Sequence, residues 1–118
     1  MYKVLLVDTD PDTVGILQEA FEKVRIARFV INETAIHHAM EVMSDDTPDL
    51  IMISADNQED EALRLVQEVR LSQHPKCLPV IFLLPETTEI TLKEKAFDAG
   101  ADHLIMKPLQ IPELATAI

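Results

Sequence analysis

Short stretches of consecutive hydrophobic residues recur along the chain, and each has the length of a single strand. Four are clear and a fifth is weaker; they cover residues 4–7, 50–53, 80–84 and 103–106, with the weaker one at 29–31. None of them alternates polar with apolar residues. Strands that are apolar on both faces are typical of a parallel sheet covered by helices on both sides. The pattern therefore predicts a buried parallel sheet.

Amphipathic stretches of helical length separate these runs. We expect helices over residues 11 to about 24, 34–43, 59–72 and 88–99, and a last one from about residue 111. Asp10 suits the N-cap position of the first helix and Pro11 its first helical position. Gly100 stands where a left-handed residue usually ends a helix. Strand and helix alternate five times, which predicts a doubly wound α/β domain with right-handed crossovers.

Length and composition fit one globular domain. The chain has 118 residues, with 47% hydrophobic and 26% charged residues, which is ordinary for a folded protein. We expect a single domain over residues 1–118. Because the sequence stops inside its last predicted helix, we also expect this domain to be the N-terminal part of a longer protein.

The charge balance narrows the classes of partner. Acidic residues number 21 against 10 basic ones, for a formal net charge of −11. This disfavours direct binding of nucleic acid or of anionic membranes, which both attract Lys and Arg. The single cysteine, Cys77, excludes a disulfide framework and fits a reducing cytoplasm. No apolar run approaches the ~18 residues of a membrane span, so we expect a cytoplasmic protein.

Candidate chemistry is confined to a few residues, because ligands of open parallel sheets bind beyond the carboxyl ends of the strands. With only two glycines in the chain, a glycine-rich phosphate loop is excluded. The residues at the strand ends are Asp8, Thr9 and Asp10, then Ser54, Ala55 and Asp56, then Leu84 and Pro85, and finally Met106, Lys107 and Pro108.

Three stretches of the chain carry recognisable motifs: VLLVDTDP, TPDLIMIS followed by PVIFLL, and AFDAGADHLIMKP. Together they resemble the response-regulator receiver domain of two-component signalling, and the resemblance covers the whole chain. The last is the most specific, because a Gly-Ala-Asp turn, an apolar strand and Lys-Pro rarely occur together. The resemblance implies a flavodoxin-like (CheY-like) three-layer fold, with a five-stranded parallel sheet in the order 2-1-3-4-5 and five helices. It also implies an ancestral function of accepting a phosphoryl group from a histidine kinase.

The pocket implied by this resemblance departs from the family pattern at several positions. The third strand of a receiver ends in the aspartate that is phosphorylated, and here that position is Ser54. Two acidic residues that hold Mg²⁺ normally follow the first strand, and here they are Asp8 and Thr9. The Thr or Ser that binds the phosphoryl oxygens after the fourth strand is replaced by Leu84.

The charges left in the pocket predict that phosphoryl transfer is lost. The family's three carboxylates and one lysine sum to −2, which a divalent cation balances, whereas Asp8 and Lys107 sum to zero. We expect a direct ion pair between these two residues, weak or absent Mg²⁺ binding, no cofactor and no resident metal. Ser54 has no adjacent base that would activate it. We therefore expect no enzymatic activity and no conventional phosphorylation.

Two alternatives stay open at this stage. Asp56 lies two residues beyond Ser54, on the same side if the strand continues, so a noncanonical phospho-switch could use either residue. Asp10 and Asp56 could also join Asp8 in a weak divalent site. Helix capping is the simpler interpretation of both, since Asp56 opens a D-x-x-E capping box. The other alternative is a small-ligand sensor, because the modified pocket carries less charge than that of the family.

The resemblance also indicates a working surface. Receivers generally use the fourth helix, fifth strand and fifth helix for dimerisation and for contact with effector domains. In this chain that surface would include Leu92, Lys93, Phe97, Leu104, Met106 and Ile111. Because Leu104 replaces the aromatic switch residue of the family, we expect one fixed conformation. The chain is thus predicted to be a pseudo-receiver that binds a protein partner or effector domain, or forms a homodimer through this face, without phosphorylation.

An acidic run and a pair of histidines can both be explained without a binding site. The acidic run at residues 56–61 suits the first turn of a helix, with a docking surface for a basic partner as the alternative. His37 and His38 are adjacent on one predicted helix and therefore face different directions. We expect them to lie on the surface or to pack against a neighbouring helix.

Overall fold

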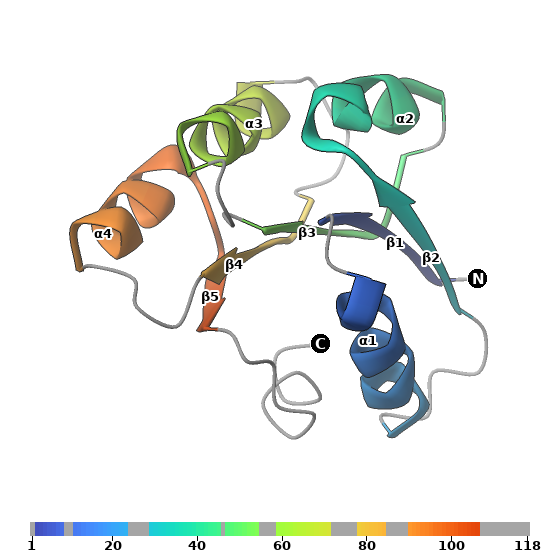
Figure 1. Cartoon of the computed structure of the whole chain (residues 1–118). Helices are drawn as coiled ribbons and strands as arrows, with labels where there is room; N and C mark the ends of the chain where they lie inside the picture. Colours follow the sequence, from blue (N-terminus) through green and yellow to red (C-terminus); the bar gives the residue numbers. More distant parts are fainter. Residues whose placement is uncertain are drawn as a thin grey trace.

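A five-stranded parallel sheet forms the middle layer of the domain (Figure 1). The computed structural model describes residues 2–8, 11–23, 29–45, 47–54, 59–71, 78–84 and 90–106. The strands are β1 (Tyr2–Val7), β2 (Phe29–Thr34), β3 (Leu50–Ser54), β4 (Val80–Leu84) and β5 (His103–Met106). They pair in the order β2-β1-β3-β4-β5, and every pair is parallel. The predicted fold class and strand order are confirmed.

Helices connect the strands as predicted, with one correction. They are α1 (Pro11–Lys23), the 3₁₀ turn η1 (Ile36–His38), α2 (Ala39–Asp45), α3 (Glu59–Leu71) and α4 (Ile90–Ala99). The helix predicted over 34–43 was wrong at its start, since β2 continues to Thr34 and α2 begins only at Ala39. The polar end of β2 does not resemble a strand, but its backbone pairs with β1 as far as Thr34 opposite Val7. The predicted fifth helix lies outside the described residues.

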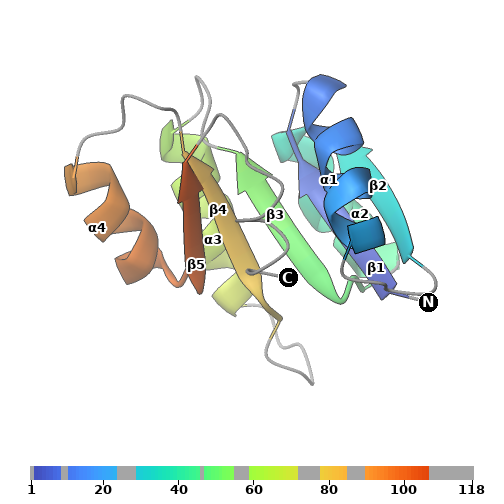
Figure 2. The same cartoon turned by 90° about the horizontal axis from the view of Figure 1, so that it is seen from below.

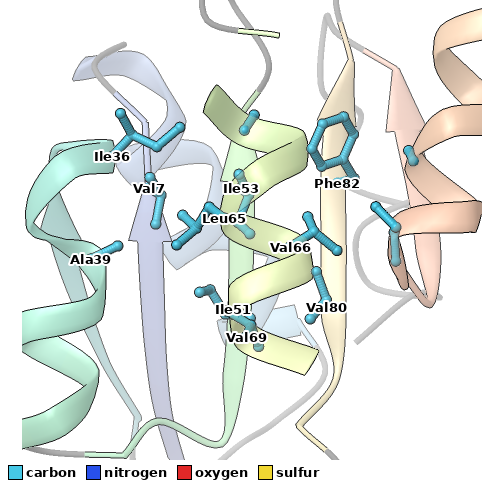
Figure 3. Close-up of a cluster of buried hydrophobic side chains, with 14 of the residues drawn as sticks. Val7, Ile36, Ala39, Ile51, Ile53, Leu65, Val66, Val69, Val80 and Phe82 are labelled. Carbon is cyan, nitrogen blue, oxygen red and sulfur yellow. The ribbon is translucent and has the colours of Figure 1, made fainter. Parts of the chain in front are cut away.

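The helices cover both faces of the sheet. Figure 2 shows α1 on the near side of the sheet and α2 and α3 on the far side. On the far side, α2, α3 and α4 pack on alternate residues of the central strands, such as Val7, Ile53 and Phe82 (Figure 3). On the near side, α1 packs on the residues between them, such as Leu6 and Met52. Every residue of β3 and β4 is buried, which explains why their sequences do not alternate.

The near-side core includes a cluster of aromatic rings at the amino end of β1. The ring of Phe21 lies 5.8 Å from that of Tyr2 and stacks on Phe29 at 5.2 Å between centroids. Burial raises the pKa of the Tyr2 hydroxyl above its ordinary value, and the negative charge of Asp49 adds to this. These contacts hold α1 against the β1–β2 end of the sheet.

Arg70 ties α3 to the amino ends of β4 and β5. Its Nε donates to the carbonyl of Gly100 at 2.7 Å and its Nη1 to the carbonyl of Leu78 at 2.6 Å, while Nη2 pairs with Asp102. The Asp102 carboxylate also accepts the Val80 N–H at 2.8 Å. The Gly-Ala-Asp turn therefore has a structural role, because its Gly100 carbonyl and its Asp102 carboxylate both accept hydrogen bonds in this network. It lies at the edge of the sheet opposite to the strand ends where chemistry was predicted.

Candidate functional site at the carboxyl edge of the sheet

Asp8 and Ser54 are neighbours at the carboxyl edge of the sheet. Val7 pairs with Ile53 in the parallel register. Asp8 directly follows Val7, and Ser54 directly follows Ile53. Both side chains are buried, with 7% and 6% exposed. In each strand the residue two positions earlier packs in the core beside α1, so the alternation of the strands places both side chains on the α1 side. The fold therefore places these two strand-end residues on the same face of neighbouring strands.

The Asp8 carboxylate is hydrogen-bonded to α1. The Thr13 hydroxyl donates to Asp8 Oδ2 at 2.8 Å, and Thr13 is itself only 2% exposed. The first turns of α1 thus hold the carboxylate that follows β1. Sequence reasoning missed Thr13, although a polar residue on the inward side of the first helix, five residues after Asp8, was a usable signal.

Leu84 lies on the other face of the sheet. Its neighbour Leu83 pairs with Ser54 and belongs to the core on the α1 side, whereas Leu84 is fully buried in the core beneath α3 and α4. Its side chain offers no hydrogen-bonding group. At the described part of this edge, Asp8 contributes the one carboxylate, Ser54 a hydroxyl and Leu84 a hydrocarbon side chain.

The described part of the predicted working surface divides between core and exterior. Leu92 is 8% exposed and packs in the core, so little of its side chain is available to a partner. Leu104 and Met106 are half-buried and pack against the same core. Lys93 is half-buried, and Phe97 is an outward-facing hydrophobic residue of α4, with 55% of it exposed.

Several predicted site residues lie outside the described ranges. They are Thr9, Asp10, Asp56, Lys107 and Ile111. The ion pair between Asp8 and Lys107 and the weak acidic site therefore stay predictions. Among the described residues, no group of three or more His, Cys, Asp or Glu side chains is arranged to hold a metal ion. Nor does any helix in those ranges have the length and apolar character needed to cross a membrane.

Solved structures of receiver domains share this fold. A response regulator from Thermotoga maritima is 22% identical, with a TM-score of 0.82 over 99% of this chain and 93% of that chain. A signal receiver domain from Clostridium thermocellum is 20% identical, with a TM-score of 0.83 over 98% of this chain and 93% of that chain.

The comparisons of sequence lead to the same family. A probable cyclic di-GMP phosphodiesterase from Vibrio cholerae is 22% identical over 118 residues, which are 98% of this chain and 25% of that protein. The chain thus spans a quarter of the length of that relative. The family model of the response regulator receiver domain matches residues 4–118. Since this match covers nearly the whole chain and the sheet has the strand order expected from it, the chain belongs to the response regulator receiver domain family.

Proposed function

We propose that this receiver domain acts in two-component signalling as a protein-interaction module that is not phosphorylated. The observation that carries the proposal is Ser54, which ends β3 at the position where the family resemblance places the phosphorylated aspartate. Ser54 is 6% exposed, and its hydroxyl is a much weaker nucleophile than a carboxylate unless a base activates it.

The electrostatics of the edge support the same proposal. Phosphoryl transfer depends on positioning and on neutralising the charge that spreads over the transferred oxygens, largely through Mg²⁺. Mg²⁺ is held in such sites by carboxylates, because it gives up its water ligands reluctantly. Among the described residues of the edge, Asp8 supplies the one carboxylate, and one of its oxygens accepts the Thr13 hydrogen bond. These residues do not fit a Mg²⁺ site of the family's kind.

The hydrophobic substitutions support a domain with one resting conformation. Leu84 replaces a hydroxyl that would bind phosphoryl oxygens, and its complete burial leaves it facing the core. Leu104 replaces the aromatic switch residue and packs against that core as well. We therefore assign no enzymatic activity, metal or cofactor to the domain, and we propose that its partners are proteins or effector domains bound in a phosphorylation-independent manner.

Beryllofluoride tests the proposal, because it mimics a phosphoryl group on the acceptor of a receiver in the presence of Mg²⁺. We expect the ¹⁵N–¹H spectrum of the protein to be unchanged when beryllofluoride and Mg²⁺ are added, relative to NaCl of the same ionic strength. Incubation with acetyl phosphate should leave the intact mass unchanged. The double variant Thr9→Asp with Ser54→Asp is the matched control, because it restores two carboxylates and should regain a response.

Shifts of wild-type amides centred on Asp8 and Ser54 would contradict the proposal. A phosphoryl increment in the intact mass that maps to Ser54 or Asp56 would support the phospho-switch instead. In either case the domain would be a responsive receiver with an altered acceptor.

A further inference from the structure

A groove separates the second and third helices on the face of the sheet away from α1. Its volume is about 540 Å³; residues Ile36, His37 and Met40 line one side, and Glu61, Arg64, Leu65 and Glu68 of α3 line the other. Figure 1 shows α2 and α3 lying side by side over the same face of the sheet. The groove therefore lies on the opposite face of the sheet from the Asp8 and Ser54 side chains, which are on the α1 side.

The floor of the groove is apolar. Ile36 and Leu65 are 9% and 4% exposed, and the half-buried Met40 packs against the same core. In Figure 3 Leu65 extends from α3 toward the α2 side, whereas Val66 extends toward β4. An apolar side chain of a partner could thus contact Ile36, Met40 and Leu65 and shield them from water.

Two exposed carboxylates border this floor. Glu61 and Glu68 are seven residues apart on α3, which places them on one face of the helix about 10 Å apart along its axis. Within the described part of the chain, neither carboxylate forms an ion pair with a side chain. Arg64 lies between them on the same face, so it offsets part of their charge.

The surroundings of the groove are strongly negative. Together η1, α2 and α3 carry six carboxylates and two guanidinium groups. One of these guanidiniums, that of Arg70, is engaged with Gly100, Leu78 and Asp102 at the end of the helix. The face therefore attracts a cationic ligand. It also repels a second copy of this chain, whose formal net charge is −11.

We propose that this groove binds an amphipathic segment of a partner protein that places an apolar side chain on the floor and a basic side chain beside each of Glu61 and Glu68. A helix with two Lys or Arg residues seven positions apart and a Leu between them meets this requirement. The inference rests on the proposed function only in assuming that the domain works by binding protein, and it adds a surface and a partner chemistry to it.

A synthetic peptide of roughly 15 residues tests the groove, with Lys at two positions two helical turns apart and Leu between them. Its binding is measured by fluorescence anisotropy at low ionic strength, and its position by ¹⁵N–¹H shifts. We expect shifts centred on Met40, Leu65 and their neighbours. The double variant Glu61→Gln with Glu68→Gln should weaken binding about fivefold or more, since each exposed ion pair contributes a modest amount.

The matched control is Glu19→Gln with Glu22→Gln, which removes the same charge from exposed positions of α1 on the other face. It should change the affinity by less than about twofold if the attraction is local rather than diffuse. The variant Met40→Gln should also weaken binding, because it removes an apolar contact. A peptide with Ser in place of Leu should bind more weakly, and one with Glu in place of Lys should not bind.

Equal weakening by the two charge variants would overturn the proposal, and so would shifts that map to α1 or α4. Adding beryllofluoride and Mg²⁺ separates this inference from the proposed function. If wild-type protein then binds the peptide at the same groove with an affinity that differs from that in the same MgCl₂ and NaF without beryllium, the groove is correct and the phosphorylation-independent function is not. If the peptide fails to bind and the ¹⁵N–¹H spectrum is still unchanged by beryllofluoride, the groove proposal is wrong and the proposed function stands.

Discussion

A buried carboxylate is tolerated when hydrogen bonds replace those it made to water, and Thr13 supplies one of these to Asp8. We predict that Thr13→Val lowers the free energy of unfolding by about 1–3 kcal/mol, because it keeps the shape of the side chain and leaves a buried acceptor with one donor fewer. The measurement is urea unfolding at neutral pH. This result would show that the hydrogen bond between Thr13 and Asp8 stabilises the fold.

A double-mutant cycle isolates that bond from other effects of the substitution. With Asp8→Ala as the second change, the Thr13→Val effect should shrink, giving a coupling energy of about 1 kcal/mol or more. If the two effects simply add, the hydroxyl does not stabilise the carboxylate, and Asp8 must be accounted for by its other interactions.

Residue types at strand ends could be predicted from sequence, but their partners could not. Asp8 and Ser54 were placed at the carboxyl edge because parallel strands all end on the same side of the sheet. The bond from Thr13 depends on the rotation of α1 about its axis, which the hydrophobic pattern defines only to within a residue or so. Leu92 shows the same difficulty, since it lies in the core although family layout placed it on the working surface.

The two glycines of the chain differ in whether a larger residue could replace them. Gly15 lies exposed in the middle of α1, and a Cβ there would meet no atom within 4 Å other than those of its own stretch of helix. Gly100 ends α4 with a φ of 119°, and a Cβ there would come 2.5 Å from Arg70 Cγ. One site therefore accepts a side chain and the other does not.

We predict that Gly15→Ala stabilises the protein by about 0.5–1 kcal/mol, because alanine is the better helix former. Gly100→Ala should destabilise it by about 2 kcal/mol or more, through an unfavourable backbone conformation and contact with the Arg70 side chain. Thermal and urea unfolding measure both changes. In an Arg70→Ala background the cost of Gly100→Ala should fall, and an undiminished cost would show that the backbone conformation alone is responsible.

Strands with unbroken apolar runs could be recognised in the sequence, whereas the polar end of the edge strand β2 could not. The unbroken apolar runs of β3 and β4 predicted central strands, and both proved to be buried throughout. β2 lies at the edge of the sheet and ends in the polar residues Asn32, Glu33 and Thr34. Backbone pairing with β1 makes these residues a strand, and no side-chain pattern indicates it, so the prediction assigned Thr34 to a helix.

The acidity of the whole molecule sets how its stability responds to ions. The formal net charge is −11, so the excess carboxylates repel one another. This repulsion is stronger in the compact folded state than in the expanded unfolded state. We predict that raising NaCl from ~10 mM to ~0.5 M increases the free energy of unfolding, because the screening length falls from about 30 Å to less than about 10 Å. Urea unfolding at several salt concentrations measures the effect.

Magnesium distinguishes this general screening from a specific site. A site with a Kd near 1 mM would add about 1.4 kcal/mol at 10 mM Mg²⁺ beyond any effect of ionic strength. For the wild-type protein we predict that MgCl₂ raises the free energy of unfolding no more than CaCl₂ of the same concentration does. The reason is that Thr9 and Ser54 stand where the family has metal-binding carboxylates. The Thr9→Asp and Ser54→Asp double variant should gain a stabilisation specific to Mg²⁺. A similar gain in the wild type would mean that Asp8 has acidic partners and that the pocket still binds metal.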